Sequence, residues 1–225
     1  MAHHNDAGNG LTSDPALDLS LDTQGIYVQG GKRLLDTVLI LLALPILLPF
    51  LVVVALAVMV DGRSPFYVQE RLGRAWKPFR MYKFRTMKPG ADALLAAYLH
   101  ENPAARIEWD HHQKLREDPR ITRVGRILRK TSLDELPQLL NVLRGQMSLV
   151  GPRPMMTEQR SMYPGFYYAL HRPGLTGLWQ VSERNGTTFA ARSVYDQRYC
   201  EEVSLSMDLS LIVRTFRIVL RATGC

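Results

Sequence analysis

The strongest feature of the hydropathy pattern is an unbroken apolar run from residue 38 to residue 60. A straight helix of this length measures about 35 Å, enough to cross a hydrocarbon core of about 30 Å. Pro45 and Pro49 lie inside the run about one helical turn apart, and each removes a backbone hydrogen bond and favours a kink. The run therefore predicts a membrane-bound chain whose membrane helix is bent.

The charges on either side of the run bear on whether it crosses the bilayer or turns back. Lys32 and Arg33 precede it, and Arg63, Arg71 and Arg74 follow it. Basic flanks favour the cytoplasmic side, so both ends favour the same side, as in a proline-broken re-entrant helix. A single kinked span is the alternative, because membrane helices tolerate proline. A secretory signal peptide fits less well, since the run is too long and begins too far into the chain.

Shorter patterns follow the apolar run. Residues 66–68 and 79–87 alternate aromatic or apolar with polar side chains, and a turn at 73–78 lies between them. This alternation predicts a β-hairpin at the membrane exit. A helix is expected at 91–98, followed by a charged connection that continues to residue 119.

Two later segments, 121–130 and 208–221, are amphipathic, with apolar residues on one helical face and most arginines elsewhere. Such helices suit the lipid interface, although packing on a soluble core explains either one alone. Together with the apolar run they favour a protein that sits in one leaflet. The expected fold is α+β and mostly helical: a monotopic membrane protein with a proline-broken re-entrant helix, a small β-hairpin and interfacial amphipathic helices.

The chain divides into three parts by composition. Residues 1–30 form a polar tail without hydrophobic periodicity and are expected to be disordered. Residues 31–61 form the membrane helix, and residues 62–225 form one domain at the membrane surface. Cys200 and Cys225 do not make a disulfide framework, which agrees with a reducing, cytosolic compartment.

The formal net charge is +7, which fits an anionic membrane surface, nucleic acid or a phosphorylated substrate. Nucleic acid is the weakest of these, because no recognised binding motif is present and the arginines fall in short clusters beside apolar runs. We therefore expect lipid and phosphate partners and no nucleic acid.

The candidate chemistry begins at residues 129–138, which contain two adjacent carboxylates. Ser132 and Glu135 have the spacing of a capping box, or else Asp134 is the N-cap and Pro137 lies in the first turn. Either arrangement puts Asp134 at a helix N-terminus, where the macrodipole and free N–H groups favour negative charge. Taken alone, this pattern is explained more simply by a helix start than by catalysis.

Two further clusters shift that balance. Arg153 stands between two prolines in the segment 148–154, and Arg172 precedes a Pro-Gly pair in the segment 172–181. A guanidinium suits bidentate contact with phosphate oxygens, and the neighbouring prolines restrict the backbone at both arginines. Arginine, proline and glycine recurring in loops, together with paired carboxylates, indicate a phosphate-handling site.

Six motifs follow one another along the chain. They are KRLLD at 32–36, YKFRTM at 82–87, DPRIT at 118–122, TSLDELPQ at 131–138, SLVGPRP at 148–154 and RPGLTGLWQV at 172–181. Their order resembles the bacterial sugar transferase family, the monotopic phosphoglycosyl transferases that initiate exopolysaccharide and related glycan assembly, over nearly all the chain beyond the tail. The resemblance implies transfer of hexose 1-phosphate from a UDP-sugar, preferably UDP-galactose or UDP-glucose, to polyprenol (undecaprenyl) phosphate. It also implies release of UMP at the cytoplasmic face of the bacterial inner membrane.

The resemblance assigns roles to individual residues. Asp134 corresponds to the nucleophile, and Glu135, with Asp134, to the ligands of a Mg²⁺ cofactor. The residues expected to bind substrate or phosphate are Lys83, Arg85, Arg129, Arg153, Arg172 and Arg184. The residues expected to anchor the membrane helix are Lys32, Arg33, Pro45 and Pro49, with Pro49 as the helix-breaking proline.

The sequence departs from the family pattern at Leu48, Gln146 and Glu183. Two other functions stay open: direct transfer in a ternary complex, with Asp134 as base or metal ligand, and a non-catalytic membrane scaffold of a polysaccharide assembly complex. The sugar, and a monomer or homodimer as the assembly state, are also left open by the sequence.

Overall fold

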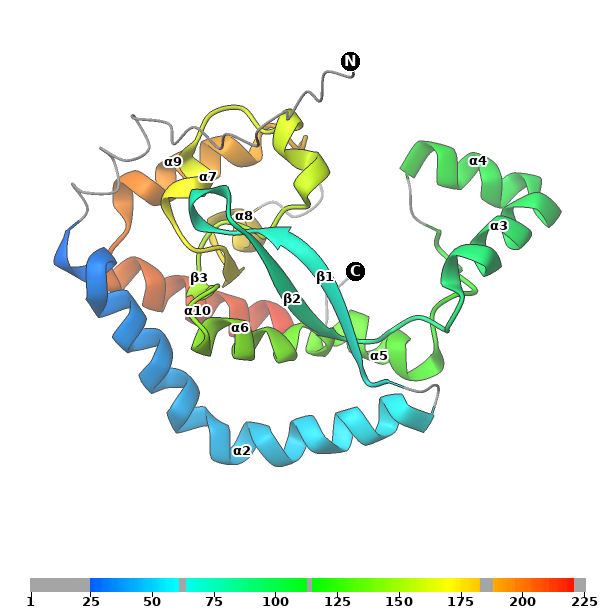
Figure 1. The fold of residues 1–225 in the computed structure, drawn as a ribbon, viewed down its shortest axis with the longest axis horizontal. Coiled ribbons are helices and arrows are strands. Elements are labelled where there is room, and N and C mark those ends of the chain that lie inside the picture. Colours follow the sequence, from blue (N-terminus) through cyan, green and yellow to red (C-terminus); the bar gives the residue numbers. More distant parts are fainter. Residues whose placement is uncertain (1–24, 61–63, 113–114, 183–187, 221–225) are drawn as a thin grey trace, which may run out of the picture.

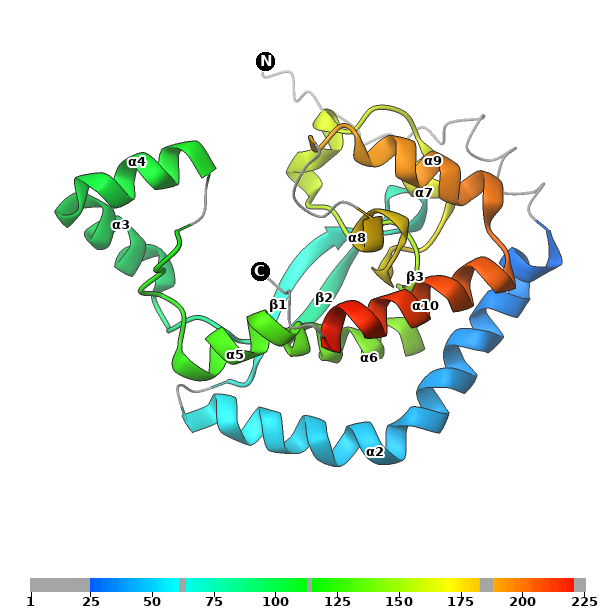
Figure 2. The ribbon, with the colours of Figure 1, turned by 180° about the vertical axis from the view of Figure 1, so that it is seen from behind.

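A computed structural model describes residues 25–60, 64–112, 115–182 and 188–220 of the chain. The described part begins with a π-helical turn, η1 (Tyr27–Gly31), that leads into the long helix α2 (Lys32–Val60). α2 bends near its middle, and most of the remaining fold lies inside the bend (Figures 1 and 2). Pro45 and Pro49 lie within the helix and explain the bend, which confirms the predicted kink.

α2 presents most of its apolar surface to the outside. Within the described residues, it belongs to the one helix long and apolar enough to cross a membrane, and only 11% of its most apolar window is buried. Leu42 and Ile46, near the bend, are 72% and 78% exposed. So much exposed apolar surface on one helix marks a membrane contact rather than a buried core helix.

Both halves of α2 are attached to the same body. Ile40, in the first half, lies in a buried cluster with Phe79. Val58, in the second half, lies in a second buried cluster with Phe84 and Leu128. The helix therefore touches the body near both ends and leaves its bend exposed.

A buried polar network fixes the start of α2. The Lys32 ammonium, in a side chain only 6% exposed, pairs with the Asp208 carboxylate, which also accepts a 2.8 Å hydrogen bond from the Tyr199 hydroxyl. The Arg33 guanidinium donates to the carbonyl oxygens of Val142 and its neighbour along the chain. Lys32 thus anchors α2 to the body by an internal ion pair, instead of facing lipid headgroups as a basic flank would.

The described structure begins before the predicted end of the polar tail at residue 30. Residues 1–24 lie outside the described residues, whereas Tyr27–Gly31 form η1. The Tyr27 hydroxyl donates a 2.7 Å hydrogen bond to Asp208, far along the chain. This contact extends the ordered structure beyond the boundary that composition indicates.

The predicted β-hairpin is confirmed. Strands β1 (Phe66–Leu72) and β2 (Pro78–Phe84) pair antiparallel, with the short helix η2 (Arg74–Trp76) at the turn. The pairing ends before Met87, which makes an isolated bridge with Ile121. The hairpin crosses the interior of the fold and forms one wall of the site described below (Figure 1).

Two helices, α3 (Ala91–Glu101) and α4 (Pro103–His112), project from the body on the side of the end of β2 (Figures 1 and 2). α3 is the predicted helix, three residues longer. α4 occupies part of what was expected to be a charged connection. Its polar composition gives no apolar periodicity, and Pro103 stands at its first position, where the missing N–H costs nothing.

The middle of the chain forms α5 (Arg123–Thr131), η3 (Leu133–Gln138) and α6 (Leu139–Leu143). Thr122 caps α5, because its hydroxyl accepts a 2.8 Å hydrogen bond from the Gly125 amide. η3 packs against β2, which places the predicted acidic pair beside the hairpin. The first amphipathic segment is therefore a helix, as predicted.

The last third of the chain closes the other side of the site. β3 (Ser148–Val150) and β4 (Gly174–Thr176) form a parallel two-stranded sheet. The remaining elements are η4 (Thr157–Met162), α7 (Tyr167–Leu170), α8 (Leu178–Ser182), α9 (Arg192–Glu202) and α10 (Leu205–Leu220). α10 is the second predicted amphipathic helix, with Leu211 in the core and Val213 and Phe216 exposed.

Candidate active site

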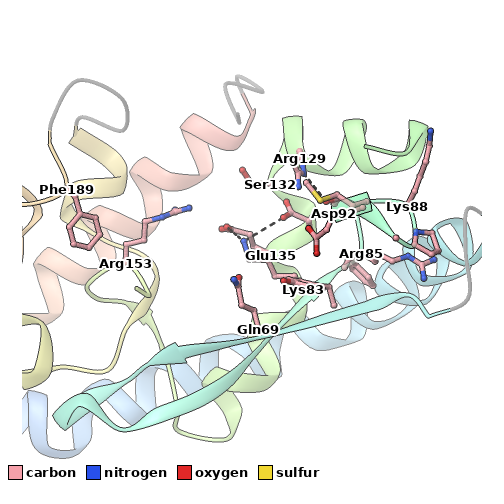
Figure 3. Close-up of a pocket in the computed structure, with 18 of the residues that line it drawn as sticks. Gln69, Lys83, Arg85, Lys88, Asp92, Arg129, Ser132, Glu135, Arg153 and Phe189 are labelled. Atoms are coloured by element: carbon pink, nitrogen blue, oxygen red, sulfur yellow. Dashed lines mark hydrogen bonds and ion pairs between the residues drawn. The ribbon is translucent and has the colours of Figure 1, made fainter. Parts of the chain in front are cut away.

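A cavity of about 1000 Å³ lies between the hairpin, the α5–η3 corner and the segments around α8 and α9 (Figure 3). Its volume is at the upper end of the usual range for small-molecule sites. It gathers most of the predicted site residues from separate parts of the chain: Lys83, Arg85, Arg129, Asp134, Glu135 and Arg153.

The acidic pair lies in the first turn of η3. Ser132, with φ of +57°, ends α5 in the left-handed conformation and turns the chain into η3. The Ser132 side chain makes no cap hydrogen bond, so the proposed capping box with Glu135 is not formed, and Asp134 is not the N-cap either. The prediction that Asp134 lies at a helix N-terminus is confirmed, although the helix is a 3₁₀-helix.

Lys83 of β2 links the two carboxylates. Its ammonium nitrogen lies 2.8 Å from Glu135 Oε1 and 3.9 Å from Asp134 Oδ2. Burial raises the pKa of Asp134; the charge of Lys83 lowers it and that of Glu135 raises it, and the net direction is upward. A carboxyl group with a raised pKa in a cavity, beside a cation, is a candidate reactive group.

Arg129 is held at the cavity wall by Thr86, whose hydroxyl accepts a 2.9 Å hydrogen bond from the Arg129 Nε–H. Burial lowers the pKa of Arg129. α5 approaches the end of the hairpin closely because Gly125 has no side chain; a Cβ there would lie 2.1 Å from the Thr86 carbonyl oxygen. Thr86 belongs to a recognised motif, but its positioning of Arg129 was not predicted.

Arg153 reaches the cavity from the loop after β3. Gly151 and Gly174 allow β3 and β4 to pack against each other, since a Cβ on Gly174 would lie 2.1 Å from the Gly151 nitrogen. The Arg153 guanidinium lies 5.9 Å from the ring centroid of Trp179. The glycine-proline motifs therefore build the strand pair that directs Arg153 into the site.

One predicted substrate-binding residue of the described structure is not brought into this group, and another falls outside the described residues. Arg172 does not line the cavity; it is half-buried, and its Nε–H donates a 2.8 Å hydrogen bond to the Gly145 carbonyl oxygen. Arg184 lies outside the described residues, as does Glu183, one of the departures from the family pattern.

Gln146, another departure, lies in a network outside the cavity lining. Its Oε1 accepts a 2.7 Å hydrogen bond from the Asn141 amide, and Asn141 Oδ1 accepts a 3.1 Å bond from the Tyr82 backbone. A carboxylate at position 146 could accept the same bond. Position 146 supports the hairpin through Asn141, so the residue type at this position affects the packing beneath the site.

The cavity is also lined by residues to which the motifs assigned no role, of which only Trp179 stands in a motif: Gln69, Lys88, Asp92, Trp179, Phe189 and Arg192. Lys88 closely follows the YKFRTM motif and Gln69 alternates into the cavity along β1, so local pattern could have suggested both. Phe189 and Arg192 have no local signal, because only the tertiary packing of α9 brings them to the site.

The donor groups of the cavity suit Mg²⁺. Asp134, Glu135 and Asp92 supply carboxylate oxygens to its lining. The described residues contain no group of three or more His, Cys, Asp or Glu side chains placed to hold a metal. Mg²⁺ commonly takes only one or two carboxylates and completes its shell with water and substrate phosphates, so this donor set fits an ion that is bound together with a phosphate ligand.

An exposed apolar helix, on a body whose cavity is lined by paired carboxylates, a lysine and arginines, defines a membrane-associated class of protein with a site suited to anionic ligands. The chain belongs to the bacterial sugar transferase family, whose sequence profile it matches over residues 27–222. The family predicted from the six motifs is therefore confirmed.

Several curated relatives support this assignment. The chain is 46% identical over 195 residues to the UDP-galactose-lipid carrier transferase of Erwinia amylovora, covering 86% of this chain and 41% of that protein. It is 44% identical over 208 residues to the exopolysaccharide production protein ExoY of Sinorhizobium fredii, covering 90% and 92%. It is 44% identical over 195 residues to the undecaprenyl-phosphate galactose phosphotransferase of Salmonella typhimurium, covering 86% and 41%. The chain thus spans less than half of two of these relatives and nearly all of ExoY.

Proposed function

We propose that the protein is a UDP-sugar:polyprenyl-phosphate sugar-1-phosphate transferase that starts exopolysaccharide synthesis. It would move hexose 1-phosphate from UDP-galactose or UDP-glucose to undecaprenyl phosphate and release UMP. The observation that carries the proposal is the Asp134–Glu135 pair beside Lys83 in a cavity lined by arginines. A Salmonella relative is named for galactose, and a relative from Caulobacter vibrioides, 38% identical, is named UDP-glucose:undecaprenyl-phosphate glucose-1-phosphate transferase.

The reaction proceeds in two displacements. A carboxylate oxygen of Asp134 attacks the β-phosphorus of the UDP-sugar, and the bond from that phosphorus to the bridging oxygen breaks, so UMP leaves with the electron pair. An oxygen of the lipid phosphate then attacks the same phosphorus. The acyl-phosphate bond breaks, the Asp134 carboxylate is restored, and the product is polyprenyl diphosphate-sugar.

The cations of the cavity make the first attack feasible. A carboxylate that approaches a diphosphate meets like charge, and Lys83, Arg129 and Arg153, which line the same cavity, offset this repulsion. Mg²⁺, held by Asp134 and Glu135 together with the diphosphate, would supply further neutralisation when bound. The raised pKa of Asp134 agrees with a carboxylate that is partly removed from water.

The bent helix places this chemistry at a membrane surface. We propose that α2 is re-entrant in the cytoplasmic leaflet of the bacterial inner membrane. A straight span would carry the second half of α2 to the far side of the bilayer, whereas Ile40 and Val58 both pack on the same body. The exposed apolar residues Ile127 of α5 and Phe216 of α10 would then face the lipid interface. A lipid phosphate and a cytosolic nucleotide sugar meet at this depth.

The test is intact-protein mass spectrometry of wild type and Asp134→Asn, each incubated with Mg²⁺ and a panel of UDP-hexoses without lipid acceptor. We expect a mass increase of one hexose phosphate in the wild type alone, and its loss when undecaprenyl phosphate is added. Asp110→Asn, which removes an exposed carboxylate of α4, is the matched control and should keep the adduct.

Other outcomes would redirect the proposal. UMP release only when both substrates are present, with no adduct from any donor, would indicate direct transfer in a ternary complex, with Asp134 as base or metal ligand. An absence of UMP release with every UDP-sugar, with and without acceptor, would favour a non-catalytic scaffold.

A further inference from the structure

Two arginines that the reaction above does not use lie at one end of the cavity. Arg192, the first residue of α9, lines the main cavity, and Arg71, near the end of β1, lines a smaller adjoining cavity of about 50 Å³. Arg153 lines both. We propose that Arg71, Arg153 and Arg192 together bind the diphosphate of the nucleotide donor, an inference that rests on the proposed function.

Both additional arginines have an unused hydrogen-bond donor. The Nε atoms of Arg71 and Arg192 are buried and have no hydrogen-bond partner in the described structure. An unpaired buried N–H is unfavourable, and phosphate oxygens match the fork of a guanidinium well. Arg71 is already oriented, because its Nη2 donates a 2.6 Å hydrogen bond to the side-chain oxygen of Gln69. Phosphate oxygens would therefore satisfy donors that the protein itself leaves unpaired.

The three guanidinium groups concentrate positive charge. Burial first, and then the charge of Arg153, lower the pKa values of both Arg71 and Arg192. Over the described part of the chain, the salt bridges within 4.0 Å include none from these three arginines. Asp196 lies one helical turn after Arg192, but its carboxylate accepts a 2.8 Å hydrogen bond from the Tyr163 hydroxyl. A cluster of like charges of this kind suits an anionic ligand.

Aromatic rings orient Arg192. Its guanidinium carbon lies 4.4 Å from the ring centroid of Trp179 and 4.6 Å from that of Phe189. Arg153 lies over the same indole at 5.9 Å. Rings that cover the faces of a guanidinium leave its N–H edge to bind oxygens in the plane, and they reduce the entropy lost on binding. Trp179 therefore holds two of the three arginines in fixed positions.

The position of the cluster favours the nucleotide over the lipid phosphate. Figure 3 shows Arg153 and Phe189 on one side of Glu135 and Arg85 on the other. The Arg85 end of the cavity lies next to the membrane helix, because Arg85 Nη2 donates a 3.4 Å hydrogen bond to the Val58 carbonyl oxygen of α2. A lipid phosphate would enter from the Arg85 side. The opposite end, with the three arginines, is left for a donor that arrives from the cytosol.

The test compares donor and acceptor constants of the full-length protein in lipid nanodiscs. For Arg192→Gln and Arg71→Gln, we expect the KM for the UDP-hexose and the Kd for UDP to rise about 10- to 100-fold, as loss of a charge-assisted hydrogen bond predicts. The KM for undecaprenyl phosphate should stay within about twofold. Arg192→Lys keeps the charge without the planar fork and should fall between wild type and Arg192→Gln. Arg198→Gln, on an exposed part of the same helix, is the matched control.

The outcomes separate this inference from the proposed function. A rise in the acceptor KM with an unchanged donor KM would assign the cluster to the lipid phosphate and overturn the proposal, as would no change in either constant or in the Kd for UDP. If the wild type binds UDP but transfers no sugar, weaker UDP binding by the variants would still support the site while the proposed reaction fails. A folded Arg192→Lys variant with wild-type UDP affinity and donor KM would show that positive charge alone is sufficient at this position. It would overturn the claim that the planar guanidinium of Arg192 binds phosphate oxygens.

Discussion

The Lys83 ammonium nitrogen lies 2.8 Å from the Glu135 carboxylate but 3.9 Å from that of Asp134. Lys83 therefore bonds directly to one member of the acidic pair and acts on the other through its charge. This asymmetry suits a division of roles in which Asp134 stays available to attack a phosphorus atom while Glu135 is held in place. Lys83 is thus the cation that interacts with both carboxylates of the pair.

Replacing Lys83 should therefore impair catalysis more than folding. Lys83→Met removes the charge that opposes repulsion between Asp134 and the diphosphate, and we expect kcat/KM for the donor to fall by about 100-fold or more, as for loss of one stabilising donor in an active site. Lys83→Arg should retain part of the activity. Initial rates of UMP release measure both, and a Lys83→Met rate within about threefold of wild type would contradict this role.

The rate should depend on pH through Asp134. Burial raises its pKa above the ordinary value of 3.8, and only the ionised carboxylate can attack phosphorus. The acid limb of kcat/KM for the donor should therefore lie above pH 3.8 and mark the pH below which activity is lost. A pH profile of UMP release measures this limb, with recovery of activity at neutral pH as the control for acid damage. An acid limb at or below the ordinary value would argue against Asp134 as the attacking group.

The same burial predicts that Asp134→Asn stabilises the fold at neutral pH. Because the folded-state pKa is raised, the folded protein binds the proton more tightly than the unfolded chain does. The protonated Asp134 contributes fully to the stability of the fold below pH 3.8, and this contribution is lost as the pH rises through the raised pKa. The ionised carboxylate therefore destabilises the fold at pH 7. Thermal unfolding in detergent should show a higher Tm for Asp134→Asn at pH 7, and the difference should shrink as the pH approaches 3.8. A lower Tm for the variant at pH 7 would show that the contact with Lys83 outweighs burial.

The buried ion pair of Lys32 and Asp208 should be important for stability. Lys32→Met leaves the Asp208 carboxylate buried without its countercharge, and breaking a buried pair in this way costs about 3–5 kcal/mol. The double variant Lys32→Met/Asp208→Asn should recover part of the loss, because no charge is then left unpaired. Arg198→Gln, which breaks an exposed pair, is the control and should change the Tm little. Equal losses in the single and double variants would rule out an unpaired charge as the cause.

The parts of the fold with a local signal could be predicted from the sequence. Pro45 and Pro49 predict the bend of α2, and the alternation of aromatic or apolar with polar residues predicts the β1–β2 hairpin. The sequence does not predict α4, because its two large apolar residues, Ile107 and Trp109, are two positions apart and give no helical periodicity. The basic and apolar neighbours of Lys32 predict a membrane flank, but its partner Asp208 lies 176 residues away, and only the packing of α10 brings the two together.

The site follows the same division. Asp134, Arg129 and Arg153 stand in short motifs whose residue types suit phosphate chemistry, and the structure brings them to one cavity. Arg192 has no motif around it, and its place beside Arg153 depends on Trp179 and the packing of α9 on α8. Local sequence therefore identified Asp134, Arg129 and Arg153, whereas the addition of Arg192 to Arg153 in one cluster required the tertiary structure.

The topology of α2 can be tested from its two ends. In a background with Cys200 and Cys225 replaced by serine, single cysteines are placed at Gly25 and Ser64, both exposed and on either side of the helix. If α2 is re-entrant, a membrane-impermeant maleimide should label both positions in inverted membrane vesicles and neither in intact spheroplasts. A cysteine at Ile46, in the exposed apolar bend, should resist the reagent from both sides because lipid covers it.

A spanning helix gives the opposite pattern, with one end labelled from each side, and would refute re-entrance. The prolines provide the matched variant for this test. Pro45→Ala/Pro49→Ala restores two backbone N–H groups and removes the clashes that bend the helix, so a straighter α2 becomes long enough, at about 43 Å, to cross the bilayer. Labelling at Ser64 should then shift in part to the outer side, and sugar transfer should fall with it, because the same bend holds the cavity at the membrane surface.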